Sequence, residues 1–74
     1  MKIEIYGADW CGHCVKAKEL CKEKELDFTF KNVTETPSYL DELTDRLGAR
    51  PSTIPQIFID GEHIGGYAEL ADKL

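Results

Sequence analysis

The sequence has no long apolar run and few basic residues, and each shortage excludes a class of protein. No stretch approaches the roughly 18 apolar residues that a membrane-spanning helix needs. The first residues also lack the charged and then apolar layout of a signal peptide. Lys and Arg number 9 against 14 Asp and Glu, which gives a formal net charge of −5. Phosphate binding needs a clustered basic surface, so we do not expect nucleic acid as a partner. Because the sequence shows neither a membrane span nor a signal peptide, we expect a cytoplasmic protein that does not bind membranes.

Cysteine is also scarce, with three in 74 residues. A small secreted scaffold usually carries an even set that forms two or more disulfides, which this odd count does not supply. Two of the three lie close together at the ends of Cys11-Gly12-His13-Cys14, and the third is Cys21. This pattern indicates a chain kept mostly reduced, with one reversible cysteine pair used for chemistry.

Local patterns predict seven elements within one small domain of residues 1–74. Alternating or β-branched segments predict the strands, and runs of helix formers bounded by Gly or Pro predict the helices. Strands are expected over 2–6, 28–33, 56–59 and 62–64, and helices over 11–25, 37–47 and 67–74. Thr36 is the expected N-cap of the middle helix and Gly48 its stop.

The element order β-α-β-α-β-β-α predicts an α/β fold. The first unit is a parallel βαβ, right-handed by the usual rule, and the Asp60-Gly61 turn adds an antiparallel hairpin. Helices must then cover both faces of a mixed four-stranded sheet. Helical spacing places an apolar stripe on the first helix and Leu70, Ala71 and Leu74 inward on the last. The charges of the first helix, Lys18 among them, are expected to form a solvated face.

The motif cysteines lie where the first strand passes into the first helix. Cys11 at the helix N-terminus is close to free backbone N–H groups and to the positive end of the helix dipole, which favour thiolate over thiol. Cys14 follows one turn later on the same side, within disulfide range. We expect Cys11 to attack a substrate disulfide and Cys14 to resolve the mixed disulfide.

His13, between the two cysteines, is expected to stabilise a thiolate and so to make the pair more oxidising. A structural zinc half-site is the alternative for this motif, although zinc needs four ligands and no second cysteine pair is present. Cys21 lies about two turns after Cys14, too far for pairing within an intact helix, and is expected to be a buried, inert thiol.

Trp10-Cys11-Gly12-His13-Cys14 resembles the active-site motif of the thioredoxin superfamily, in the version typical of protein disulfide isomerases. The rest of the chain resembles the glutaredoxins of that superfamily, with a strand directly before the motif and the segments 53–59 and 61–66 after it. The resemblance covers essentially the whole chain and implies a thioredoxin fold and thiol–disulfide oxidoreductase activity. It extends to small bacteriophage glutaredoxins, which reduce ribonucleotide reductase.

The same resemblance implies roles for individual residues. Cys11 matches the nucleophile, Cys14 the resolving cysteine, and Pro55 a cis-proline that turns the Ile54 backbone toward a bound peptide. Without the resemblance, Pro55 is only a proline at a strand start, and Gly65 and Gly66 only form a bend. The positions implied to contact substrate or glutathione are Trp10, Thr53, Ile54, Pro55, Gly65, Gly66 and Tyr67.

Several positions depart from the glutaredoxin pattern. Gly12 and His13 occupy slots that usually hold Pro and Tyr, and Ala8 stands where a lysine is frequent. Ala68 stands where an Asp usually holds the glutathione amine, with Glu69 one residue later. Two charged contacts to glutathione are thus missing. Lys16 and Arg50 are the cations expected to substitute, and exposed charges of this kind contribute little.

The resemblance implies no tightly bound cofactor and no metal site. The expected partners of this monomer are a disulfide-bearing protein, such as ribonucleotide reductase, and glutathione or a flavoprotein reductase as the electron source. Trp10 is expected either to pack against the sheet edge or to form an apolar platform for a docking protein. Two alternatives stay open: deglutathionylation by Cys11 alone, and an iron–sulfur cluster held between two chains by Cys11 and glutathione.

Overall fold

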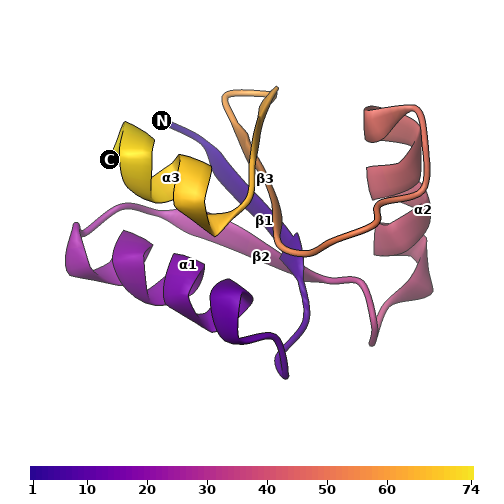
Figure 1. Ribbon diagram of the computed structural model, residues 1–74, viewed down its shortest axis with the longest axis horizontal. Helices are drawn as coiled ribbons and strands as arrows, with labels where there is room; N and C mark the ends of the chain where they lie inside the picture. The colour runs from indigo at the N-terminus through magenta and orange to yellow at the C-terminus, as the bar shows by residue number, and fades with distance from the viewer.

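The computed structural model describes all residues, 1–74, and contains the seven elements in the expected order (Figure 1). Their bounds are β1 (Ile3–Gly7), α1 (Gly12–Glu23), β2 (Phe28–Asn32), α2 (Pro37–Leu47), β3 (Gln56–Ile59), β4 (Glu62–Gly65) and α3 (Tyr67–Lys73). The longest helix, α1, has 12 residues, and no helix combines the length and apolarity needed to cross a bilayer.

The four strands form one mixed sheet in the order β2-β1-β3-β4. β1 runs parallel to β2, with Ile3 opposite Phe28, and antiparallel to β3, with Ile3 opposite Ile59. β3 and β4 pair antiparallel through the Asp60–Gly61 turn, whose two residues have φ values of 51° and 83°. These values match a hairpin turn of two residues in the left-handed region. The expected mixed sheet, with its parallel first unit and its hairpin, is confirmed.

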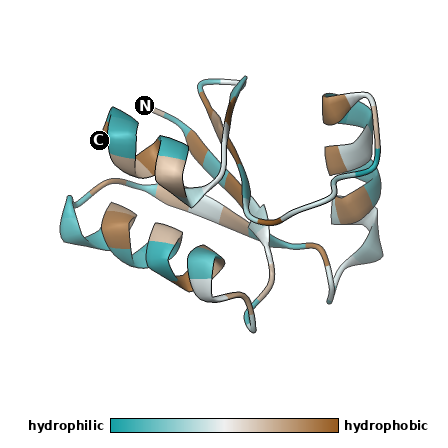
Figure 2. Ribbon diagram, viewed as in Figure 1, coloured by the Kyte–Doolittle hydropathy of each residue, from teal (hydrophilic) through white to brown (hydrophobic).

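One face of the sheet is covered by α1 and α3 (Figure 1). Alternation along the strands directs Ile3, Ile5 and Ile57 to this face, where they are almost fully buried. Three helical side chains complete the cluster: Ala17, Cys21 and Leu70. Figure 2 shows hydrophobic residues along the strands and on parts of the helices that flank them. Burial of each large aliphatic side chain contributes about 1.5–3 kcal/mol, so this cluster fixes α1, and with it the cysteine motif, on the sheet.

The opposite face is covered by α2 alone. Its core consists of Tyr6, Val33, Leu43 and Phe58, with the rings of Tyr6 and Phe58 packed edge to face at 5.6 Å between centroids. The expectation that helices cover both faces is therefore confirmed.

A buried polar network lies beside this second core. Glu4 is only 5% exposed, and its Oε2 accepts hydrogen bonds from Lys31 Nζ at 3.2 Å and Arg46 Nη1 at 3.0 Å. Lys31 also donates to Glu42 Oε2 at 2.6 Å, and both cations donate to the hydroxyl of Tyr6. A solvent-open hollow of about 610 Å³ adjoins these groups. The network joins α2 to β1 and β2 through fully paired charges.

The helix ends differ in detail from the sequence-based expectations. α1 begins at Gly12 rather than Cys11, which is its N-cap, and ends at Glu23 because Glu25 adopts a φ of 57°. Thr36 is the N-cap residue of α2, as expected, but its side chain makes no capping hydrogen bond. The side-chain oxygen of Asn32 instead accepts the N–H groups of residues 34 and 35, which turns the chain before α2 begins.

The expectation that Ala71 points inward is also wrong, because Ala71 is exposed. In α3 the inward stripe runs from Tyr67 through the fully buried Leu70 to Leu74, at spacings of three and four residues. Ala71 lies one position beyond Leu70, about 100° around the helix, and so faces solvent.

Candidate active site

The turn from β1 into α1 places Cys11 at the helix N-terminus. Its backbone is extended, with φ −86° and ψ 116°, and its Sγ accepts the N–H of Cys14 at 3.3 Å. The sulfur thereby takes the position that an oxygen occupies in an ordinary N-cap residue. It lies among the N–H groups that the first turn leaves without helical partners, where negative charge is favoured. Cys11 is partly exposed and unpaired, so the sulfur is accessible.

Cys14 lies beneath this turn and is fully buried. Its Sγ packs against the backbone of Gly7 at the end of β1, where a methyl group would overlap the sulfur. Burial raises the pKa of Cys14 to about 12, and its hydrogen bond with Cys11 adds to this rise. The two motif sulfurs therefore differ sharply: Cys11 is accessible, and Cys14 is enclosed and held protonated.

The loop before β3 reaches the motif from the other half of the chain. The Ile54–Pro55 peptide bond is cis, as the resemblance implies, and Pro55 is buried. The carbonyl oxygen of Ile54 lies 3.7 Å from Cys11 Sγ, which donates to it as a thiol. A side chain on Gly66 would meet the Pro55 carbonyl oxygen at 3.3 Å, so a glycine there lets the start of α3 approach this loop closely.

A groove of about 350 Å³ lies where these three segments meet. It is lined by one residue of α1, the loop before β3 and the start of α3: His13, Thr53, Ile54, Pro55, Gly66, Tyr67, Ala68 and Glu69. Six of the ten sequence-based site residues thus line one groove. The other four, Trp10, Cys11, Cys14 and Gly65, are each next in sequence to a lining residue or within three residues of one. Neither Lys16 nor Arg50 lines the groove.

Glu69 binds a backbone donor at Gly66, one of the positions that the resemblance implies for contact with substrate or glutathione. Its Oε1 accepts the N–H of Gly66 at 2.7 Å, which is one half of a capping box at the start of α3. Gly65, with a φ of 117°, carries no Cβ and leaves space for this carboxylate, which would otherwise lie 2.6 Å from the added atom. A carboxylate of the chain itself therefore already neutralises part of this helix terminus.

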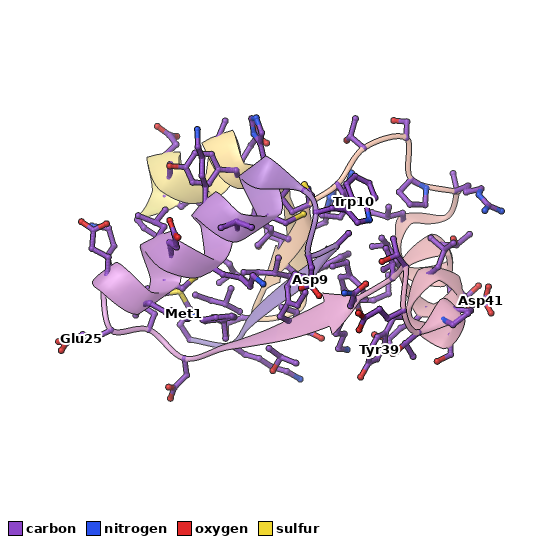
Figure 3. All side chains as sticks on the ribbon, turned by 90° about the horizontal axis from the view of Figure 1, so that it is seen from below. Met1, Asp9, Trp10, Glu25, Tyr39 and Asp41 are labelled. Carbon is purple, nitrogen blue, oxygen red and sulfur yellow. The ribbon has the colours of Figure 1, made fainter.

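His13 and Trp10 are both exposed, but only His13 contacts another aromatic ring. The imidazole of His13 is exposed and packs edge to face against Tyr67, with 6.1 Å between ring centroids. Trp10 is 74% exposed, and Figure 3 shows it with Asp9 at the N-terminal end of α1. Of the two expectations for Trp10, packing against the sheet edge is therefore wrong, and the apolar platform agrees with its exposure.

Lys18 differs from the expectation of a solvated charge. Its Nζ lies 4.0 Å from the centroid of the Phe30 ring and 3.7 Å from Asp9 Oδ1, and its side chain is 22% exposed. The signal that was available is the spacing of four residues from Cys14, which puts both side chains on one side of α1.

Cys21 is fully buried in the cluster under α1, as expected, and burial raises the pKa of its thiol. His63, expected at the surface, is exposed and pairs with Gln56 at 2.7 Å. No group of three or more His, Cys, Asp or Glu side chains in the structure is arranged to hold a metal ion.

Comparison with known proteins agrees with this geometry. The family model for glutaredoxin matches residues 3–64. Glutaredoxin 3 of Escherichia coli K12 is 37% identical over 68 residues, covering 92% of this chain and 80% of its own. Among solved structures, glutaredoxin 1 of Francisella tularensis is 38% identical with a TM-score of 0.75, over 97% of this chain and 93% of its own. Reduced E. coli glutaredoxin is 29% identical with a TM-score of 0.80, over 99% and 92%. The chain thus belongs to the glutaredoxin family and is a thiol–disulfide oxidoreductase of thioredoxin fold.

Proposed function

We propose that this glutaredoxin reduces disulfides of partner proteins by a dithiol mechanism in which Cys11 attacks and Cys14 resolves. The observation that carries the proposal is the contrast between the two sulfurs. Cys11 Sγ is accessible beside the groove and accepts an N–H of the first helical turn, whereas Cys14 is enclosed beneath it. An accessible sulfur in a donor-rich position suits attack, and an enclosed neighbour suits a later intramolecular step.

The chemistry proceeds in two exchanges. The Cys11 thiolate attacks one sulfur of the substrate disulfide, so that a Cys11–substrate bond forms while the substrate disulfide breaks and releases a first thiolate. Cys14 then loses its proton and attacks Cys11 Sγ, which forms the Cys11–Cys14 disulfide and releases the second substrate thiolate. The substrate gains two electrons and two protons, and the protein loses both.

The groove supports recognition of an extended peptide. Ile54, Pro55 and Thr53 line it on one side, with the Ile54 carbonyl directed toward Cys11 Sγ. A substrate segment that lies along this loop would pair its backbone with the chain as an added strand does. Trp10, exposed next to the motif, adds an apolar contact for a docked protein. Ribonucleotide reductase, the partner implied by the resemblance, is one disulfide-bearing protein of this kind.

Glutathione is the proposed electron source, with binding weaker than in glutaredoxins that carry a cation at the groove. Its carboxylates meet no Lys or Arg among the lining residues, and Glu69 adds a negative charge. His13 is the one lining group that takes a positive charge. A flavoprotein reductase is the alternative electron source, and NADPH consumption with each recharging system in turn distinguishes the two.

Cysteine variants test the dithiol mechanism. In a coupled NADPH assay with a protein disulfide, we expect Cys11→Ser and Cys14→Ser each to lose nearly all activity. Cys21→Ser is the matched control and should retain it, because Cys21 lies in the core away from the groove. Full protein-disulfide turnover by Cys14→Ser would contradict the proposal. If Cys14→Ser still turns over a glutathione mixed disulfide and Cys11→Ser does not, the monothiol route is assigned to Cys11.

A further inference from the structure

Lys18 places a positive charge on the side of α1 that carries the buried Cys14. It follows Cys14 by four residues on α1, so the two side chains share one side of the helix. Its ammonium is held at 4.0 Å over the Phe30 ring and at 3.7 Å from the Asp9 carboxylate. Because the side chain is only 22% exposed, water screens this charge less than it screens a free surface lysine.

The Phe30 ring links this cation to the resolving sulfur. A methyl group built on Gly7 would overlap Cys14 Sγ and lie 3.4 Å from Phe30 Cε1, so the sulfur and the edge of the ring converge on the same point. The ammonium lies over that same ring. Burial raises the pKa of Cys14, the hydrogen bond with Cys11 raises it further, and the positive charge of Lys18 acts in the opposite direction.

The balance among these influences changes during the reaction. Once Cys11 is bonded to a substrate sulfur, it carries no negative charge and no longer acts on Cys14 as a thiolate. Burial then remains as the main influence that raises the pKa of Cys14, while a hydrogen bond with the Ala8 backbone and the charge of Lys18 lower it. The resolving step begins with ionisation of Cys14, and burial raises the pKa of this thiol, so its thiolate is scarce at neutral pH. A nearby cation therefore favours the Cys14 thiolate at the step that needs it.

We propose that Lys18 is a positioning residue for the resolving step, its ammonium fixed by Asp9 and Phe30 so that it favours the Cys14 thiolate. The inference rests on the dithiol mechanism proposed above. The proton of Cys14 passes to solvent, the thiolate attacks Cys11 Sγ, and the leaving substrate thiolate takes up a proton in turn. Lys18 keeps its own proton throughout and neither forms nor breaks a bond.

The other groups around Cys14 do not supply this charge. Cys11 on the same helix is the sulfur under attack, and β1 and β2 contribute Gly7 and Phe30, which are uncharged. Asp9, from the turn before the motif, is negative and pairs with Lys18. His13 is exposed and packs against Tyr67 of α3 on the groove side.

A single-turnover reaction with a symmetric aromatic disulfide measures the two steps separately. Attack by Cys11 releases the first coloured thiolate, and resolution by Cys14 releases the second, so the rate of the second phase reports the step in question. For Lys18→Gln we expect the first phase to be unchanged and the second to be about three- to tenfold slower near neutrality. The pH profile of the second phase should move to higher pH, which a purely structural role would not cause.

Two variants serve as controls for this experiment. Lys18→Arg keeps the charge and should restore the second phase, and Lys22→Gln, which is exposed and one turn farther from the motif, should leave both phases unchanged. A second phase in Lys18→Gln with the wild-type rate and pH profile would overturn the inference, as would equal slowing of both phases. A second phase that persists in Cys14→Ser would instead overturn the dithiol mechanism, so the two failures are distinguishable.

Discussion

At the scale of single residues, the environment of each cysteine decides its chemistry more than its place in the motif does. Cys11 is partly exposed at a helix N-terminus, Cys14 is enclosed against Gly7, and Cys21 is packed among aliphatic side chains. Burial raises the pKa of both Cys14 and Cys21, and the value for Cys14 reaches about 12. Three thiols in one short chain therefore differ in accessibility and in ionisation.

This difference predicts selective alkylation. Brief treatment of the reduced native protein with iodoacetamide near neutral pH should add one group, at Cys11, because the reagent reacts with accessible thiolates. After unfolding, all three cysteines should react. Peptide mass spectrometry locates the label, and Cys11→Ser should remain unlabelled over the same time. Labelling of Cys14 at a rate comparable to Cys11 in the native protein would contradict the assignment of roles.

At the scale of elements, α2 is attached to the sheet by charges as well as by apolar packing. Burial raises the pKa of Glu4, but hydrogen bonds from Lys31 and Arg46 outweigh burial and bring the pKa below its ordinary value of 4.5. Glu42 shifts in the same direction, chiefly through its hydrogen bond from Lys31. The folded state therefore binds these protons more weakly than the unfolded chain does.

This network predicts a loss of stability in acid. Carboxylates with a lowered folded-state pKa stabilise the fold fully above their unfolded pKa, and the contribution is lost as the pH falls through the folded value. The thermal midpoint should thus fall as the pH drops below about 4.5. Glu4→Gln should destabilise the protein by about 2–3 kcal/mol at neutral pH, because it leaves the partly buried cations Lys31 and Arg46 with a weaker partner.

Thermal denaturation followed by circular dichroism across the acid range checks both expectations. Glu35→Gln removes an exposed carboxylate and is the matched control, which should change the midpoint little at any pH. Glu4→Gln should also show a shallower acid dependence than the wild type. If the two variants have the same midpoint at neutral pH, the network does not hold α2 in place.

The elements themselves were predictable because their signals are local. Alternation in 2–6, the Pro37 and Gly48 boundaries of α2 and the Asp60–Gly61 turn each depend on a few adjacent residues. The cysteine spacing is equally local. Three side-chain contacts were not predictable in this way: Asn32 with the N–H groups of residues 34 and 35, Glu69 with Gly66, and Lys18 with the Phe30 ring. They depend on side-chain directions, and the last also on a distant segment, which periodicity does not encode.

At the scale of the whole molecule, little apolar surface is left for self-association. Met1 and Trp10 are the only large hydrophobic side chains that are exposed, at 66% and 74%. The Cα radius of gyration is 11.2 Å, which agrees with about 11 Å expected for one chain of this length. The net charge of −5 adds mutual repulsion between copies.

We therefore expect a monomer. Sedimentation equilibrium of the reduced protein should give a single species of 8.4 kDa over a wide range of concentrations. The measurement is made with a thiol reductant present, so that intermolecular disulfides through Cys11 do not form. A concentration-dependent rise toward twice the mass would show that a face of the molecule pairs with its own copy.

The approach of Ile54 to Cys11 joins positions that are 43 residues apart in sequence. An unfolded chain still carries two thiols separated by two residues, but it has no carbonyl opposite them and no groove beside them for a substrate. Catalytic turnover therefore reports whether the fold is intact. On heating, catalytic decay should coincide with the spectroscopic melting curve instead of preceding it.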